Sequence, residues 1–321
     1  MRGICSLVIL ILGFSSQYVV AQGADDANDP LNPQRYIPNT SYAYAGFGVY
    51  MAVVAGCLAW SIRYRAVYMI VLILSASLYA VGIMLRTVFA KDPHNITKFV
   101  AMRLMTLIPA GGFFVLVYVL FVQLVLHLQA VDLLPLNPKI IAVVYIIMET
   151  VCIAVQSAGA AFSPSSSASN QSLAKTLSLV GFAAQLALVA TFTAVYILFV
   201  YRFRKLQPEE WKARPYGRFK HFTIIVYNLG FAYQGLLIRT AYRLLEAAQG
   251  PDGKLARSEL WFYMLDALQL LNVILGFVIF WPPYYLRPAM QIRLENPSHI
   301  ELQGSPHSRK SASPERAYRE A

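Results

Sequence analysis

Charged residues are scarce in this chain, and their scarcity excludes most classes of soluble protein. Asp, Glu, Lys and Arg make up only 13% of its 321 residues, whereas hydrophobic residues make up 57%. A soluble domain carries about 25% charged residues. The composition is therefore typical of a membrane protein.

Residues for disulfide, metal or acid–base chemistry are also few. The three cysteines, Cys5, Cys57 and Cys152, lie in apolar runs and form no CxxC spacing or disulfide framework. All five histidines lie in loops, at the ends of apolar runs or on the C-terminal tail, away from where an intramembrane zinc hydrolase needs them. The GxxxxGK phosphate loop is missing as well. We expect no catalytic residue, no metal and no cofactor, and the chain is not predicted to be an enzyme.

The N-terminus reads MRGICSLVILILGFSSQYVVAQG, with Arg2, a short apolar core and V-V-A ending at Ala21. This pattern predicts a cleaved signal peptide over 1–21, because the apolar run is too short to span a bilayer. An uncleaved anchor is the alternative. Residues 22–41 would then form an extracellular N-terminal segment.

Long hydrophobic runs dominate the rest of the sequence. A helix needs about 20 apolar residues to cross the hydrocarbon core, and seven runs after the signal reach this length. They cover 42–62, 66–90, 104–128, 139–162, 173–201, 219–247 and 258–284. We predict an all-α membrane protein with a seven-transmembrane helix bundle over 42–286. Residues 287–321 are mostly polar and predict a disordered cytoplasmic tail.

Lys and Arg predict the orientation of this bundle. With the N-terminus outside and the C-terminus cytoplasmic, the inner segments hold sixteen basic residues and the outer segments seven. The net charge of +11 then reflects loops that face an anionic leaflet, so no nucleic-acid partner is needed. Three N-x-S/T triplets, candidates for glycosylation, start at Asn39, Asn95 and Asn170 in segments predicted to lie outside.

Two apolar runs contain charged groups at matching intervals. The sixth run carries Arg239, Arg243 and Glu246, and the seventh carries Glu259, Tyr263 and Asp266. The i, i+4, i+7 spacing predicts that each group shares one helix face. With the two helices antiparallel, Arg239 is expected opposite Asp266. Arg243 is expected at a height between Glu259 and Tyr263.

Other polar residues are predicted in the same half of the bundle, and two interpretations of the whole set remain open. It is either a buried ionic latch that fixes helix register or the lining of a polar cavity open to the outer face. On the second interpretation, the candidate substrate-binding residues are Arg86, Glu149, Gln156, Gln185, Arg239, Arg243, Glu246, Glu259, Tyr263 and Asp266.

Two stretches resemble signatures of the fungal lipid-translocating exporter family, also called aminocholesterol-resistance-like. The first is IRTAYRLLEAAQGPDGKLARSELWFYMLD, and the second is METVCIAVQSAGAAF, in which Glu149, Gln156 and Gly159 match in spacing. The chain departs from the family in having Glu149 where Asp is usual and Tyr79 where a Glu is usual. An arginine expected on the third span is missing, with Gln123 nearby.

The resemblance implies a seven-span fungal protein of the plasma membrane. Its implied function is transport, or facilitated translocation, of a sphingoid-base-like or other amphipathic lipid, with a link to stress resistance against membrane-active toxicants. Membrane lipids and an amphipathic small molecule are the implied partners, and protein partners are not indicated. The alternative is a seven-span sensor or receptor that signals through the basic fifth loop and the tail.

Overall fold

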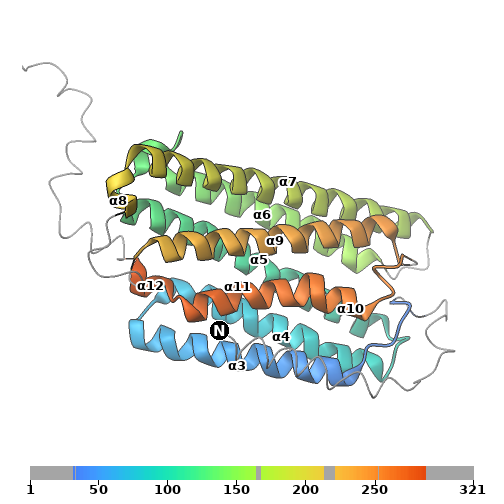
Figure 1. Ribbon diagram of the computed structural model, residues 1–321. Helices are drawn as coiled ribbons and strands as arrows, with labels where there is room; N and C mark the ends of the chain where they lie inside the picture. Colours follow the sequence, from blue (N-terminus) through green and yellow to red (C-terminus); the bar gives the residue numbers. More distant parts are fainter. Residues whose placement is uncertain (1–31, 33, 164–167, 213–220, 252, 287–321) are drawn as a thin grey trace, which may run out of the picture.

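The computed structural model describes residues 32, 34–163, 168–212, 221–251 and 253–286. Within these ranges the chain is largely helical and contains no strand, which confirms the predicted all-α fold. The long helices run side by side with their connections at the two ends of the bundle (Figure 1). The predicted signal peptide at 1–21 and tail at 287–321 lie outside the described residues.

Each predicted apolar run corresponds to a long helical segment. Six segments are single helices: α3 (Thr40–Tyr64), α4 (Ile70–Ala90), α5 (Ile96–His127), α6 (Pro138–Phe162), α7 (Ala168–Leu206) and α9 (Thr223–Gln249). The seventh is composite and runs through α10 (Glu259–Phe262), the π-helical turn η5 (Tyr263–Ala267) and α11 (Leu268–Ile279). The short elements are η2 (Val67–Met69), η3 (Val131–Leu133), α8 (Pro208–Lys212) and α12 (Pro282–Tyr285).

Six of these segments are long and apolar enough to cross a membrane, and α9 is not among them. The polar residues Asn228, Gln234, Arg239 and Arg243 lower its hydropathy. Asn228, Arg239 and Arg243 are buried inside the bundle. Most of these polar side chains of α9 therefore do not face the surroundings of the bundle. Length and composition thus support a multi-pass membrane protein with six candidate spans.

Local signals in the sequence set the helix boundaries. The side chains of Asn39, Asn95 and Asn137 accept hydrogen bonds from backbone N–H groups at the starts of α3, α5 and α6. Gly250, with φ of 74°, ends α9, because glycine adopts this backbone conformation without strain. Asn39, Asn95 and Asn170 start the three N-x-S/T triplets, which are also called sequons. We call the end of the bundle that holds these three asparagines the sequon end.

The long segments form a closed ring. Each packs against its neighbours in chain order, and the seventh segment returns to pack against α3. Helix α5 also contacts α9 and α11 across the ring, and it is the most buried of the candidate spans. Ring aromatics, centred on Phe192 and Tyr118 with centroids 4.4 Å apart, fill part of the core. The polar residues that face inward are therefore enclosed by several helices.

Glycine permits the closest helix contacts on which this ring depends. A Cβ atom at Gly82 of α4 would lie 2.6 Å from the carbonyl oxygen of Met105 on α5. A Cβ atom at Gly159 of α6 would lie 2.9 Å from the carbonyl oxygen of Ala174 on α7. Small residues at these positions thus allow neighbouring helices to approach closely.

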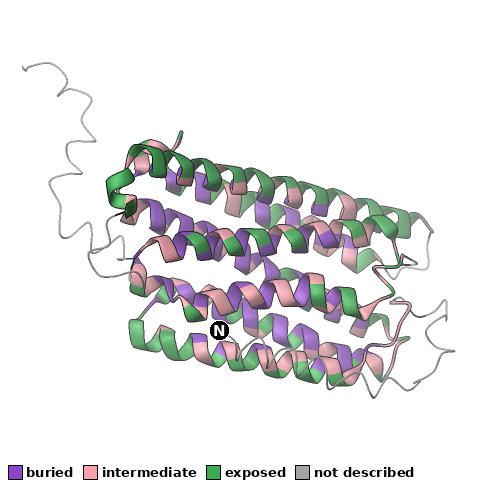
Figure 2. Ribbon diagram, viewed as in Figure 1, coloured by how far each residue is buried: buried purple, intermediate pink, exposed green. Residues whose placement is uncertain are grey.

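The outer surface of the ring is apolar. Exposed residues follow the outward faces of the helices, while buried residues line the inside (Figure 2). Large hydrophobic side chains on this surface include Val67, Ile62 and Val180, which are 78%, 71% and 58% exposed. An apolar surface of this extent fits contact with lipid acyl chains rather than water.

Candidate functional site

Asp266 is the centre of the charged cluster. It lies in the π-helical turn η5, is fully buried, and has arginines from α9 on one side. The Nε atom of Arg239 lies 2.8 Å from Oδ1 of Asp266. Arg243 donates through Nε to Oδ1 at 3.0 Å and through Nη2 to Oδ2 at 2.8 Å. The predicted pairing of Arg239 with Asp266 is confirmed.

A tyrosine completes the shell around this carboxylate. The Tyr79 hydroxyl, from α4, donates to Oδ2 of Asp266 at 2.6 Å. The Tyr50 hydroxyl, from α3, donates to the carbonyl oxygen of Ala267 at 2.6 Å, within the π-helical turn. A π turn leaves carbonyls out of the regular ladder, so a side-chain donor here stabilises it. Tyr79, which departs from the resembled family, thus directly contacts the central acid.

The seventh segment turns its predicted polar residues toward its neighbours in the ring. Glu259 and Asp266 both contact α4, through Arg86 and Tyr79, and Tyr263 and Asp266 both belong to the π turn. Glu259 faces α4 and pairs with Arg86 at 3.4 Å, while Tyr263 packs beside Gly46 of α3. Arg243, which was predicted at a height between Glu259 and Tyr263, pairs with Asp266, and its guanidinium carbon lies 5.4 Å from the ring centroid of Phe262.

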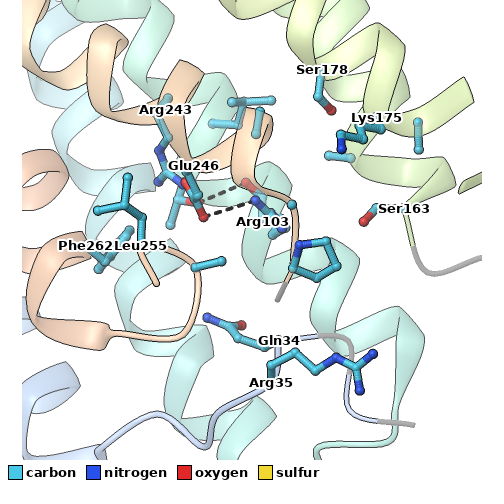
Figure 3. Close-up of a pocket in the computed structure, with 18 of the residues that line it drawn as sticks. Gln34, Arg35, Arg103, Ser163, Lys175, Ser178, Arg243, Glu246, Leu255 and Phe262 are labelled. Atoms are coloured by element: carbon cyan, nitrogen blue, oxygen red, sulfur yellow. Dashed lines mark hydrogen bonds and ion pairs between the residues drawn. The ribbon is translucent and has the colours of Figure 1, made fainter. Parts of the chain in front are cut away.

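Glu246 links the central pair to a neighbouring helix. Its Oε2 atom lies 2.9 Å from Nη1 of Arg243, and its Oε1 atom lies 3.4 Å from Nη2 of Arg103 on α5. The sequence prediction missed Arg103 because the third apolar run was started at residue 104. In the structure α5 begins at Ile96, so Arg103 lies within the helix and points toward α9 (Figure 3).

The segment 34–39, which we call the N-terminal strap, lies against the sequon end. The Arg86 guanidinium donates to the Tyr36 hydroxyl at 3.1 Å, and Gln34 donates to the same oxygen at 2.6 Å. The backbone N–H of Asn39 donates to Glu259 at 2.8 Å. Desolvation by burial raises the pKa of the Tyr36 hydroxyl, which keeps it neutral beside the arginine. These contacts tie the strap to α4 and α10.

A second polar group, made of amides and one acid, lies between α6 and α7. Gln156 donates to Gln185 and to the carbonyl oxygen of Gly181, both at 3.0 Å, and Gln185 donates to Oε1 of Glu149. Glu149 is fully buried, and its Oε2 atom has no hydrogen-bond partner among the described residues. All three were among the predicted candidate residues, and the structure brings them into contact.

A cavity of about 730 Å³ opens between the helices at the sequon end. It is lined by the ends of α4, α5, α6, α7 and α9, and by the N-terminal strap. Four predicted site residues line it: Arg86, Gln156, Arg243 and Glu246. The predicted acids Glu149, Glu259 and Asp266 are not part of this lining, nor are Gln185, Arg239 and Tyr263. These six lie behind the wall, where they pair with or support the residues that face the cavity.

The arrangement gives the cavity two chemical characters. Apolar side chains such as Met102, Leu107 and Phe182 form part of the wall, and basic, amide and hydroxyl groups together with the carboxylate of Glu246 form most of the rest. The amide chain from Gln156 to Glu149 leads from this wall into the core. No group of acids, histidines and cysteines in the described ranges could hold a metal ion. The geometry therefore suits an amphipathic organic ligand.

Comparison with known proteins finds a family match that covers the predicted binding residues. A family described as RTA1 like protein matches residues 72–289, which include all ten predicted binding residues. The chain is similar to "Protein RTA1" of Saccharomyces cerevisiae (strain ATCC 204508 / S288c), with 24% identity over 202 residues. The match covers 63% of this chain and 62% of the yeast protein, so the chain spans about three fifths of that relative's length. No solved structure matches the chain.

Proposed function

This chain belongs to the RTA1-like family of membrane proteins, which confirms the resemblance predicted from its sequence, and we propose that it facilitates translocation of an amphipathic lipid. The observation that carries this proposal is the cavity at the sequon end. Its volume of about 730 Å³ lies within the range of about 300–1,000 Å³ typical of small-molecule sites. Its wall combines apolar side chains with fixed polar groups, as a lipid head group and its first methylenes require.

The buried polar groups behind the wall support movement beyond the cavity. Oε2 of Glu149 and Nη2 of Arg239 are buried and have no hydrogen-bond partner among the described residues. Polar atoms in this state cost several kcal/mol in an apolar environment, so they are expected to be satisfied by water or by a transient ligand. The amides of Gln156 and Gln185 connect Glu149 to the cavity. We propose that these two amides form a path along which polar groups can enter the bundle.

Translocation requires a defined topology, and we propose seven spans with α9 as the sixth. Its charged residues face the ring interior, where carboxylates neutralise them, so its outward face can contact lipid. The cavity would open outside the cell, at the plasma membrane. Two features support this orientation: the asparagines of the three N-x-S/T triplets lie at the cavity end, and the sequence has sixteen basic residues in the segments predicted to lie inside.

A reconstituted transport assay tests the proposal. The full chain in liposomes should accelerate the transbilayer movement of fluorescent lipids, measured by dithionite quenching of the outer leaflet. Gln156→Leu should reduce this rate, because it replaces the amide between the cavity and Glu149 with an apolar group. Lys139→Gln, at the opposite end of α6, is the matched control. A rate no higher than in protein-free liposomes would refute translocation, and ligand binding without movement would favour the sensor alternative.

A further inference from the structure

We propose that the cavity binds the anionic phosphate head group of a lipid, not the ammonium group of a sphingoid base. This inference rests on the proposed function and specifies its substrate class. It follows from the sign of the charges that face the cavity. Of the four acids among the predicted binding residues, only Glu246 faces the cavity, and Glu149, Glu259 and Asp266 lie outside its lining.

The described lining carries an excess of positive charge. Its cationic members are Arg35, Arg86, Arg103, Lys175 and Arg243, and its one carboxylate is Glu246. An ammonium group entering this space would meet like charges at several positions. Like charges at short range in a partly desolvated site repel strongly, because the local dielectric constant is far below that of water. The lining therefore selects against a cationic head group.

Nearby carboxylates do not cancel this excess. Four arginines of the cluster, Arg86, Arg103, Arg239 and Arg243, share three carboxylates, Glu246, Glu259 and Asp266. Each of these acids is already in contact with at least one guanidinium group. Glu246, the acid that faces the cavity, lies between two arginines. In these pairs guanidinium groups outnumber carboxylates by one, and Glu149, which interacts electrostatically with Arg239, lies outside the cavity lining.

Groups from the other side of the cavity complete a site for phosphate oxygens. Lys175 and Ser178 of α7 lie across the cavity from Arg103 and Glu246 (Figure 3). Lys175 and Ser172 belong to the first two turns of α7, a helix of 39 residues whose N-terminal end carries partial positive charge. A phosphate monoester has three strong acceptor oxygens and a charge of about −1.5 to −2. It can therefore accept from several donors on both walls at once.

The test uses the purified full-length protein in a nonionic detergent and three probes. Hexadecyl phosphate and hexadecylamine share one tail and differ in head-group charge, and inorganic phosphate has no tail. Binding is measured as the shift of thermal unfolding with probe concentration, followed by tryptophan fluorescence. Hexadecyl phosphate should stabilise the protein in a saturable manner, and hexadecylamine should not. Stabilisation by hexadecylamine alone would overturn the head-group assignment, and equal affinity for inorganic phosphate would overturn the lipid assignment.

Single substitutions locate the site. Arg103→Gln and Lys175→Gln should each weaken hexadecyl phosphate binding about tenfold or more, as expected for loss of one charge-assisted hydrogen bond. Glu246→Gln should strengthen it, because it removes the carboxylate that competes with the ligand. Lys98→Gln is the matched control: Lys98 lies near the same end of α5 but pairs with Asp92, outside the cavity lining. Equal affinities in all four variants would overturn the site.

The same probes separate this inference from the proposed function. If the protein translocates neutral or cationic lipids but does not bind hexadecyl phosphate, the head-group inference fails and the proposed function stands. If it binds hexadecyl phosphate in the cavity but moves no lipid in liposomes, the proposed function fails and the anionic site stands.

Discussion

Asp266→Asn tests the charge balance inside the bundle. The substitution keeps the size of the side chain but removes the negative charge that neutralises two buried arginines. The side chains of Asp266 and Arg239 are 0% and 1% exposed, and that of Arg243 is 7% exposed. Breaking a buried ion pair by removing one partner costs about 3–5 kcal/mol, because the remaining charge is left uncompensated.

The magnitude can be measured as a change in thermal stability. A domain of 150–250 residues loses about 2–4 °C in Tm for each kcal/mol of destabilisation, so Asp266→Asn should lower Tm by roughly 6–20 °C. The assay is tryptophan-monitored unfolding in detergent. Asp92→Asn is the matched control, because its partner Lys98 is 35% exposed and the Asp92 side chain is 46% exposed. If both variants unfold at the wild-type temperature, the buried cluster does not stabilise the fold and our reasoning is wrong.

Three further variants probe neighbouring contacts. Tyr79→Phe should destabilise the protein by about 1.5–3 kcal/mol, since Asp266 loses a hydrogen bond to its charged oxygen; an unchanged Tm would contradict that role. Gly82→Ala should cost about 1–3 kcal/mol of stability, because its Cβ would overlap the carbonyl oxygen of Met105. Size-exclusion chromatography and Tm should show this loss of stability. Wild-type behaviour would argue against close contact of α4 and α5. Arg86→Gln should release the N-terminal strap and speed its proteolysis, and an unchanged cleavage rate would show that the strap is held elsewhere.

The fold was predictable to the level of helices and their neighbours. Apolar runs of sufficient length identified all seven helical segments, because a bilayer demands about 20 apolar residues per span. The charged residues of the sixth and seventh runs, joined by a short connection that makes the two helices antiparallel, were enough to place Arg239 opposite Asp266. Glu149, Gln156 and Gln185 were likewise predicted as candidates, and the first two both contact Gln185 in the structure.

Features that depend on three-dimensional detail were not predictable. Nothing in YMLDA signals a π turn, although this turn holds both Tyr263 and Asp266. Arg103 was missed, because the third apolar run was taken to begin at residue 104, whereas α5 begins at Ile96. The cavity depends on which side chains fill the space between five helices, so its positive lining appeared only in the structure.

The position of a bound lipid is the most direct test of the account. A hexadecyl phosphate analogue with a photoactivatable diazirine beside its head group should crosslink to the reconstituted protein, and mass spectrometry should locate the attachment. We predict attachment to the α5 residues 102–107 or the α7 residues 171–182, with competition by unlabelled hexadecyl phosphate. Attachment only to the outward, lipid-facing surfaces of the helices, without competition, would contradict the cavity as the binding site.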